Sequence, residues 1–519
     1  MSALATPACV ADIARIQARG RPDQAAIDFQ GRVTSFADFD ALSSRCANAL
    51  IAAGVQAGDR IAVLAKGCDD FFILWFGALK ARACLAPVNW RLAPPEIAFI
   101  VQDAGAKLWF FGETYREVTE ALAAQCPSIE RTIGFDGPSG ALPAFRDWIA
   151  EFPDIDPALA SDPQDDVIQL YTSGTTGLPK GVQLTEANYA AAFASATQGW
   201  GRFDAGDAVL VAMPLFHVAG TNMGLLSLLQ GATAIVLAEA APAAILDAVE
   251  RHRIRQAFLV PALINMVLQH PAMREERLES LEKVYYGASP ISEEVLKTAQ
   301  RRFGASFTQL YGLTETNGIG TWLSPQAHAE GRLRACGVAS PGAEVRVRAG
   351  GRDAAPLEVG EIEIRAGTVM KGYWGRAEAT AQAIDAEGWF RTGDAGYFDA
   401  EGYLHIHDRV KDMIVSGGEN VYPAEVENAL FSHPHVADAA VIGVPDERWG
   451  EAVKAIVVLR EGARPDPAGI IAHCRERIAG YKTPKSVDFA EALPRNPSGK
   501  VLRRQLREPY WAGRERRVG

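Results

Sequence analysis

The sequence is poor in cysteine and has no surplus of basic residues. Its seven cysteines in 519 residues are scattered, and no two form a CxxC pair. Neither a disulfide framework nor a zinc site is therefore indicated. They are Cys9, Cys46, Cys68, Cys84, Cys126, Cys336 and Cys474. The chain has 52 Lys and Arg against 63 Asp and Glu, a net charge of -11. We expect no nucleic-acid partner, and an anionic ligand would need a local site.

The sequence also lacks a secretory signal and a convincing membrane span. Asp12 and Arg15 interrupt the N-terminal stretch where a signal peptide would be apolar. Residues 208–238 carry no Asp, Glu, Lys or Arg, which raises the question of a transmembrane helix. Pro214, His217 and several glycines instead divide this run into a strand at 209–212, a short helix at 225–229 and a strand at 234–237. We expect a cytoplasmic protein without a transmembrane segment.

The length and the texture of the chain predict an α/β protein with more than one domain. Apolar runs of strand length alternate with amphipathic helical stretches over the first four hundred residues, which predicts parallel sheets built from βαβ units. After about Leu333, short strands separated by turn residues predict a small antiparallel or β-barrel-like subdomain. The last hundred residues predict a small α+β unit. We place the domains at 1–408 and 409–519, the second being mobile.

A glycine- and hydroxyl-rich segment, YTSGTTGLPKG at 171–181, follows an apolar strand at 167–170. Small residues allow backbone N–H groups to approach phosphate oxygens, and Lys180 adds a positive charge. The Walker A pattern GxxxxGK[ST] is absent. We interpret the segment as a phosphate-binding loop of another kind.

This loop resembles the signature of the adenylate-forming superfamily, which contains acyl-CoA synthetases, luciferases and the adenylation domains of peptide synthetases. Four further motifs follow in the order of that family: YGLTE at 311–315, GWFRTGD at 388–394, DRVKDMIVSGGENVYP at 408–423 and PRNPSGK at 494–500. The resemblance covers essentially the whole chain. Its overall texture is most similar to fatty-acyl-CoA synthetases.

The resemblance implies ATP, Mg²⁺ and coenzyme A as ligands and assigns roles to individual residues. Thr314 would contact the α-phosphate, Glu315 would hold magnesium, and Lys500 would serve adenylation. Lys411 would be the hinge between the domains. The expected catalytic set is Thr314, Glu315, Lys500 and His217. The expected ATP and AMP set is Thr172, Ser173, Gly174, Thr175, Thr176, Gly177, Lys180, Gly287, Ala288, Ser289, Tyr311, Gly312, Thr314, Asp394, Arg409 and Lys500, with Asp394 and Arg409 at the ribose.

The chemistry explains why such residues are needed. A carboxylate attacks the α-phosphate of ATP, so two anions meet and cationic groups must offset the repulsion. After adenylation, the resemblance implies that the C-terminal domain rotates and presents a CoA-binding surface. The expected CoA residues are Arg91, Gly417, Gly418, Trp449, Tyr481 and Lys485. Thr483 stands where some relatives have a basic residue, which leaves the 3′-phosphate contacts undecided.

The acyl pocket is expected around His217 and the stretch 286–289, with Thr316 and Asn317 nearby. His217 would lie at the mouth of the pocket, although a core histidine bonded to the backbone stays an alternative. These stretches carry no charge apart from Glu315, which disfavours amino acids and dicarboxylates. We expect a medium- or long-chain fatty acid or the acyl side chain of a bulky ring compound, with aryl acids such as cinnamates as the alternative.

Other readings share the adenylation motifs. An acyl-AMP ligase would load a carrier protein instead of CoA, a peptide-synthetase module would need a carrier domain, and a luciferase would need oxygen. A catalytically dead nucleotide-binding protein is the non-enzyme alternative. The basic tail from Arg503 to Arg517 is interpreted as a solvated helix, with peripheral contact to an anionic membrane left open. A homodimer also stays open.

Overall fold

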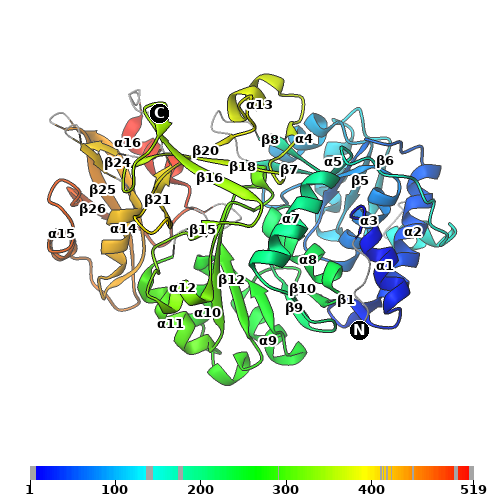
Figure 1. Cartoon of the computed structure of the whole chain (residues 1–519), viewed down its shortest axis with the longest axis horizontal. Helices are drawn as coiled ribbons and strands as arrows, with labels where there is room; N and C mark the ends of the chain where they lie inside the picture. Colours follow the sequence, from blue (N-terminus) through cyan, green and yellow to red (C-terminus); the bar gives the residue numbers. More distant parts are fainter. Residues whose placement is uncertain are drawn as a thin grey trace.

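The chain folds around four β-sheets (Figure 1). The computed structural model describes residues 7–135, 144–172, 179–289, 291–409, 412, 414–416, 419–421, 423–446, 449–495 and 501–512, without the side chains of 407–409, 415, 419–420 and 450. Two large sheets are mainly parallel, and two smaller ones are mainly antiparallel. This is the mixed α/β architecture that the sequence predicts.

The first large sheet has seven strands in the order β19-β8-β7-β4-β3-β5-β6. Its bounds are β3 (Arg60–Leu64), β4 (Cys84–Pro87), β5 (Leu108–Phe111), β6 (Arg131–Gly134), β7 (Asp166–Thr172), β8 (Lys180–Thr185) and β19 (Gly372–Tyr373). The helices between them are α3 (Asp69–Lys80), α4 (Pro94–Ala104), α5 (Arg116–Ala123) and α6 (Phe145–Ala150). The central strands are parallel, whereas β8 pairs antiparallel with β7 and β19.

The second large sheet has nine strands in the order β15-β14-β13-β12-β11-β9-β10-β1-β2. Its bounds are β1 (Ala25–Phe29), β2 (Arg32–Ser35), β9 (Ala208–Val211), β10 (Thr233–Val236), β11 (Gln256–Phe258), β12 (Lys283–Gly287), β13 (Ser306–Tyr311), β14 (Thr321–Leu323) and β15 (Val338–Ala339). Its helices are α7 (Glu186–Gly199), α8 (Val218–Gln230), α9 (Pro242–His252), α10 (Pro261–Gln269) and α11 (Glu293–Phe303). The uncharged run is therefore β9, α8 and β10, with a longer helix than expected. In the described part of the chain, no helix is long and apolar enough to cross a membrane.

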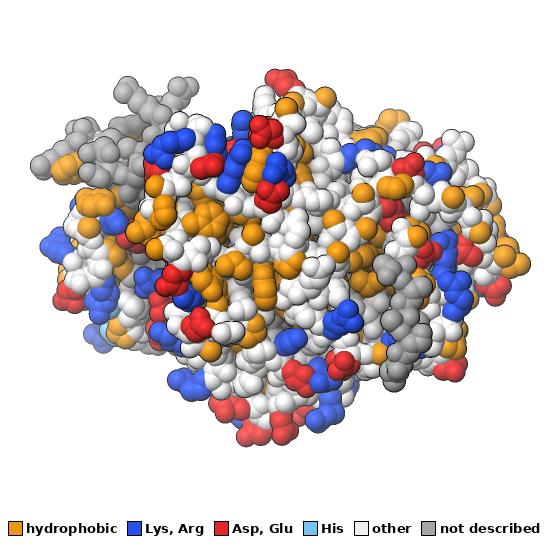
Figure 2. All heavy atoms as spheres, viewed as in Figure 1, with side chains coloured by type: hydrophobic (Ala, Val, Ile, Leu, Met, Phe, Trp, Pro, Cys, Tyr) orange, Lys and Arg blue, Asp and Glu red, His pale blue; other side chains and the backbone are white. Residues whose placement is uncertain are grey.

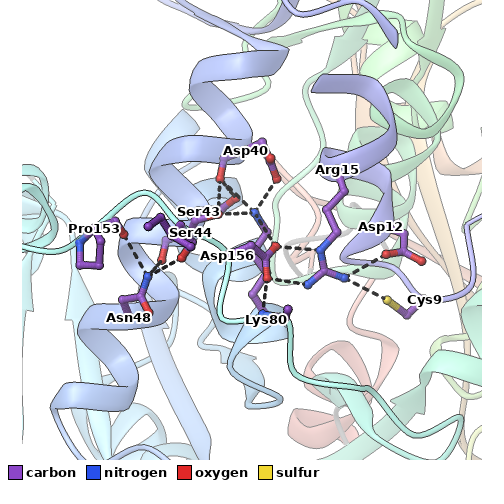
Figure 3. A network of polar contacts seen from close by, with 12 residues as sticks. Cys9, Asp12, Arg15, Asp40, Ser43, Ser44, Asn48, Lys80, Pro153 and Asp156 are labelled. Carbon is purple, nitrogen blue, oxygen red and sulfur yellow. Dashed lines mark hydrogen bonds and ion pairs between the residues drawn. The ribbon is translucent and has the colours of Figure 1, made fainter. Parts of the chain in front are cut away.

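Helix α3 lies between the two large sheets and contacts β1 of one and β4 of the other. All its residues are buried, among them Phe72, Trp75 and Phe76. A helix that is apolar all round is expected in such a position. Its last residue, Lys80, joins a polar network with α1 (Asp12–Gly20), α2 (Phe36–Ala52) and the segment 153–156 (Figure 3).

The third sheet is antiparallel throughout, in the order β17-β16-β18-β20-β21. Its bounds are β16 (Ala343–Ala349), β17 (Arg352–Asp353), β18 (Gly360–Ala366), β20 (Phe390–Phe398) and β21 (Leu404–Arg409). The short helices α12 (Pro325–Ala329) and α13 (Ala377–Ala383) flank this region. The antiparallel subdomain expected after Leu333 is thus present.

The fourth sheet belongs to the C-terminal part of the chain, at the left of Figure 1. Its strands are β22 (Ile414–Ser416), β23 (Glu419–Val421), β24 (Val436–Asp446), β25 (Gly450–Leu459) and β26 (Ser486–Phe489), with helices α14 (Pro423–Phe431), α15 (Pro467–Arg475) and α16 (Arg503–Trp511). The boundary at 408/409 stays a prediction.

The basic tail is less free than the sequence suggests. Arg503 forms an ion pair with Glu427 at 2.8 Å, and Arg507 forms one with Asp412 at 3.1 Å. These two arginines attach α16 to the C-terminal unit, so they are not simply a solvated cationic face. Elsewhere, Figure 2 shows acidic and basic side chains interspersed over the face that it presents.

Candidate active site

The two ends of the expected phosphate-binding loop, residues 173–179, lie side by side on neighbouring strands of the first large sheet. Thr172 ends β7 and Lys180 begins β8, and the two residues are paired across the strands. The loop residues Ser173, Gly174, Thr175, Thr176 and Gly177 lie outside the described residues. The structure therefore positions the two ends of the loop, and the contacts of the loop itself stay a prediction.

Glu315 lies opposite this loop, in the short 3₁₀ turn η3 (Thr314–Thr316). Its carboxylate is 9% exposed and accepts hydrogen bonds from the hydroxyls of Thr172 at 3.4 Å and Tyr373 at 2.9 Å. The ammonium of Lys180 lies 5.0 Å from the centre of the Tyr373 ring. Burial, and then the negative charge of Glu315, raise the pKa of Tyr373 far above its usual range, so its hydroxyl stays a donor. Thr172, Lys180 and Glu315 are brought together as expected.

Sequence reasoning missed Tyr373. Its strand, β19, lies almost two hundred residues after β8 and pairs with it antiparallel, so that Tyr373 faces Val182 in the ladder. The sequence signal is weak, because a tyrosine between a glycine and Trp374 matches no functional motif and is common in packed strands. Only the return of the chain to this sheet edge places it beside Glu315.

Backbone segments at the ends of β12 and β13 approach each other very closely. A Cβ atom on Gly287 would collide with the carbonyl of Leu310, and one on Gly312 would collide with the backbone of Gly318. Ala288 has a left-handed backbone, with φ of 66°. Ser289 follows it, and Thr314 is partly buried in η3. This is the narrow backbone cradle in which the nucleotide was expected.

Asp394 lies deeper, in β20, and is 9% exposed. The hydroxyl of Tyr311 donates to its Oδ2 at 2.9 Å. Burial, with a smaller contribution from Asp394, raises the pKa of Tyr311, so this donor also keeps its proton. Arg409 is the residue paired with Asp394 across β20 and β21. The proposed ribose pair is therefore adjacent, although the side chain of Arg409 is not among those described.

Several predicted residues lie outside the described residues: Lys411, Gly417, Gly418 and Lys500. Their roles stay predictions. Of the other CoA candidates, Trp449 and Tyr481 are exposed, and the ammonium of Lys485 donates to the carbonyl of Gly480 at 3.1 Å. Arg91 stacks on Trp90, with 4.4 Å between the guanidinium and the ring centre. Thr483 is 1% exposed, so it is a packed position and not a surface contact.

His217 caps the N-terminus of α8, and its ring lies 4.5 Å from that of Phe216. Burial, helped by the charge of Arg91, lowers the pKa of His217 to about 4, so the imidazole is neutral at physiological pH. Its Nε2 atom is buried and has no hydrogen-bond partner among the described residues. For this atom, the structure shows no backbone bond of the kind a core histidine would make.

An apolar cavity begins at this backbone cradle and runs along β12 and α8. It is lined by Ala196, Trp200, Gly201, Phe203, Val218, Ala219, Asn222, Met223, Leu226, Gln230, Phe258, Tyr285, Ala288, Leu310, Gly312 and Gly318. One expectation needs correction: Tyr286 does not line the cavity, because its hydroxyl is bonded to His328 at 2.9 Å. Side chains alternate along a strand, so Tyr285 faces the cavity instead. Asn317 lies beside it, where its carbonyl accepts a hydrogen bond from Asn222 at 2.9 Å.

The residues present fit a magnesium-bound nucleoside triphosphate. Magnesium usually takes one or two protein carboxylates together with phosphate oxygens and water, and Glu315 offers such an oxygen beside the phosphate-binding loop. Among the described residues, no group of three or more His, Cys, Asp and Glu side chains could hold a metal ion alone.

The fold and this site define an adenylate-forming enzyme. The chain belongs to the AMP-binding enzyme family, since residues 14–374 match that family and residues 425–500 match its C-terminal domain. It is 39% identical over 508 residues to the fatty acid–[acyl-carrier-protein] ligase ScoC of Streptomyces coeruleorubidus, covering 96% of each chain. It is 39% identical over 505 residues to a feruloyl-CoA synthase of Amycolatopsis sp, covering 95% of this chain and 97% of that one. ATP-bound MatB from Rhodopseudomonas palustris has the same fold, with a TM-score of 0.88 and 31% identity over 96% of this chain and 99% of that one.

Proposed function

We propose that this protein is an ATP-dependent acyl-CoA synthetase that makes an acyl-adenylate and then transfers the acyl group to coenzyme A. Two observations support it: the group formed by Thr172, Lys180, Glu315 and Tyr373, and an apolar cavity whose lining includes Gly312 and Gly318, three residues before and after Glu315 in the chain. Such a site places phosphate-binding groups next to space for a carboxylic acid. No side-chain nucleophile is required.

In the first step, an oxygen of the carboxylate attacks the α-phosphorus of ATP, and pyrophosphate leaves. Lys180 and the loop after Thr172 would bind phosphate oxygens, and Thr314 would contact the α-phosphate. Glu315 would hold a magnesium ion, whose charge would offset that of the phosphates. Lys500 would add a second cation. Stabilisation of this kind by charged groups is commonly the largest contribution to catalysis.

Asp394 would position the nucleoside by accepting hydrogen bonds from the ribose hydroxyls. The hydrogen bond from Tyr311 fixes its carboxylate, and Arg409 follows on the adjacent strand. We place the flat base beside Gly287, Ala288, Ser289 and Gly312, where Gly287 and Gly312 pack too closely against neighbouring backbone to carry a side chain.

In the second step, the thiol of CoA attacks the acyl carbonyl and AMP leaves. We place the CoA nucleotide on Arg91, Trp449, Tyr481 and Lys485, and the pantetheine beside Gly417 and Gly418, after rotation of the C-terminal domain about Lys411. His217 is neutral, so an anionic acyl group entering the cavity gains no ion pair there. Its free Nε2 could instead exchange a hydrogen bond with the substrate at the cavity mouth.

The acid is expected to be largely apolar, because most of the cavity wall is. A medium- or long-chain fatty acid, or the acyl side chain of a bulky ring compound, fits this wall best. Aryl acids such as cinnamates are the alternative, and the relatives include enzymes named for both kinds of acid. We further propose a cytoplasmic location, which the seven free cysteines support.

A pyrophosphate-release assay tests this proposal. It would use magnesium-ATP and a panel of fatty, alicyclic and aryl acids, with and without CoA, and mass detection of products. We expect CoA-dependent formation of acyl-CoA. Acyl-AMP without thioester would instead favour the ligase that loads a carrier protein. Lys500→Ala should abolish adenylation yet largely spare thioester formation from a supplied acyl-adenylate, and equal loss in both steps would contradict the rotating-domain scheme.

A further inference from the structure

Polar side chains occur in and beside the wall of the apolar cavity. Gly287 and Lys283 are the last and the first residues of β12. At roughly 3.3 Å per residue, their Cα atoms are about 13 Å apart. Residues 283, 285 and 287 share one face of the strand, and Tyr285 lines the cavity on that face. Lys283 therefore lies on the same face of β12 as Tyr285, at the end of the strand opposite Gly287.

The ammonium of Lys283 lies against the cavity lining at Gly201. A Cβ atom added to Gly201 would lie 2.9 Å from Nζ of Lys283, and the backbone of Gly201 is left-handed, with φ of 95°. Gly201 is itself a lining residue. The ammonium thus lies next to the cavity wall, at a position where the left-handed backbone favours glycine.

Lys283 has no ion pair or hydrogen bond through its side chain with any described residue. The acidic neighbour of Lys283 in the chain, Glu282, already has a partner, because it accepts a hydrogen bond from Arg255 at 2.7 Å. Lys283 is partly buried. An ammonium beside a cavity wall and without a described protein partner is available to donate to an acceptor on a ligand.

Two neutral donors belong to the wall of the same cavity. The indole Nε1 of Trp200 is buried without a hydrogen-bond partner among the described residues. Gln230 accepts a hydrogen bond from the backbone N–H of Phe203 at 2.7 Å through Oε1, which leaves its amide nitrogen to donate elsewhere. Both side chains line the cavity. A buried donor without an acceptor costs free energy that a ligand acceptor would recover.

We propose that Lys283, Trp200 and Gln230 form a distal polar subsite, and that the acid activated by this protein carries an oxygen-containing group at the end opposite its carboxylate. This inference rests on the proposed function and narrows its substrate class. It also changes the expectation that the acid carries no second charged group. That expectation was drawn from the stretch 286–289 and the surroundings of His217, which hold no cation, whereas Lys283 lies just outside them. Ring acids and chain acids with a distal hydroxyl, ketone or carboxylate fit this subsite, and unsubstituted acids leave it without a partner.

Two matched series of acids test the subsite. One compares cinnamic acid with 4-hydroxycinnamic acid, and the other compares decanoic, 10-hydroxydecanoic and decanedioic acids. kcat/KM for thioester formation would be measured for the wild type, Lys283→Met and Trp200→Phe. The control is Lys297→Met, at a surface lysine of α11 that is paired with Glu293.

We expect the wild type to favour an oxygenated member over its unsubstituted counterpart in at least one series. Lys283→Met should lower kcat/KM for that member by about 10- to 100-fold, the usual range for a hydrogen bond to a charged group. It should leave the unsubstituted member within about threefold of the wild type, and Lys297→Met should change neither. Trp200→Phe should weaken the same preference independently, mainly through KM.

The outcomes separate the two proposals. Preference for decanedioic acid would identify an anionic partner, and preference for the hydroxy acids would identify a neutral one; both support the subsite. A wild type that turns over the unsubstituted acids best, or a Lys283→Met variant that loses activity equally on both members, would overturn the subsite and leave the synthetase function standing. If the wild type activates no acid at all, the proposed function fails and the subsite fails with it.

Discussion

Two polar regions of this protein each contain a lysine, and the two lysines differ in whether the protein supplies partners for the ammonium. Around Lys80, every charge has a partner: the ammonium donates to Oδ1 of Asp40 at 2.6 Å and to Ser44 at 2.9 Å, and lies 3.5 Å from Asp156 (Figure 3). Arg15 donates to the same oxygen of Asp156 at 2.7 Å. Around the acyl cavity, in contrast, Lys283 and the indole nitrogen of Trp200 have no described partner.

The difference indicates what each region is for. Partnered buried charges join elements far apart in the sequence, here α1, α2, α3 and the segment 153–156, and removing one member is costly. Polar atoms left without partners in a cavity wall destabilise the empty protein, so they are expected where a ligand supplies the missing partner. We therefore assign the first region to stability and the second to substrate recognition.

The largest effect should come from removing the charge at the centre of the first region. Lys80 has a side chain that is 0% exposed, and Lys80→Met would leave the partly buried carboxylates of Asp40 and Asp156 without this cation. We expect the free energy of unfolding to fall by about 3–5 kcal/mol. Chemical denaturation measures this change.

The control for this variant is Lys297→Met on the surface, which should stay within about 0.5 kcal/mol of the wild type. Pyrophosphate exchange by folded Lys80→Met protein should be unchanged. A stable but inactive variant would reverse the assignment of this region.

The opposite pattern is expected at the nucleotide site. Glu315→Gln keeps the shape of a side chain that accepts hydrogen bonds from Thr172 and Tyr373 but removes the charge that would hold magnesium. Pyrophosphate exchange should fall by about 10²- to 10³-fold, with little change in melting temperature. Exposed Glu344, paired with Arg365 at 2.7 Å, provides the control Glu344→Gln. Normal exchange in Glu315→Gln would remove the metal assignment.

A smaller effect concerns pH and an acid next to the first region. Glu186 is 6% exposed and accepts a hydrogen bond from the backbone N–H of Val10 at 2.7 Å, and burial raises its pKa to about 7. The folded protein therefore holds this proton more tightly than the unfolded chain. Stability should fall as pH rises from the unfolded value of about 4.5 to about 7 and then level off, by on the order of 3 kcal/mol.

Glu186→Gln should flatten this dependence, measured as the unfolding free energy at several pH values. Part of the slope should remain, because burial also raises the pKa of Asp70, to about 6. A slope that is identical in the variant would show that Glu186 titrates normally in the folded protein.

Much of the fold follows from local patterns in the sequence, because strand-length apolar runs and amphipathic helices are local properties. The uncharged run at 208–238 illustrates this, since its breaks predict β9, α8 and β10. The position of α3 between two sheets, and the return of β19 to β8, depend on contacts between distant segments. No local pattern contains that information.

The same division applies to the candidate site. Thr172, Lys180, Glu315 and Asp394 could be proposed because their motifs resemble those of a known superfamily, and the structure brings the first three together. Tyr373 and Lys283 could not, because neither lies in such a motif. The pocket was expected at the whole stretch 286–289, and of these residues Ala288 lines the cavity, whereas the hydroxyl of Tyr286 is bonded to His328. Which side chains of a strand face a cavity depends on how the strand packs against other elements, and a sequence motif does not show this.

The smallest effect offers the sharpest test of the comparison, because it uses the same substitution in both regions. Trp75 is fully buried and its indole donates to the carbonyl of Val167 at 3.0 Å, so Trp75→Phe should lose that bond and leave an unpaired carbonyl, at a cost of about 1–3 kcal/mol in addition to the lost packing. Trp200→Phe removes a donor that has no described partner, so apart from the lost packing the free energy of unfolding should change by less than about 1 kcal/mol. Denaturation of both variants without ligand measures the contrast. Equal losses would mean that the indole of Trp200 is already satisfied in the empty protein, and the cavity would then no longer differ from the network around Lys80.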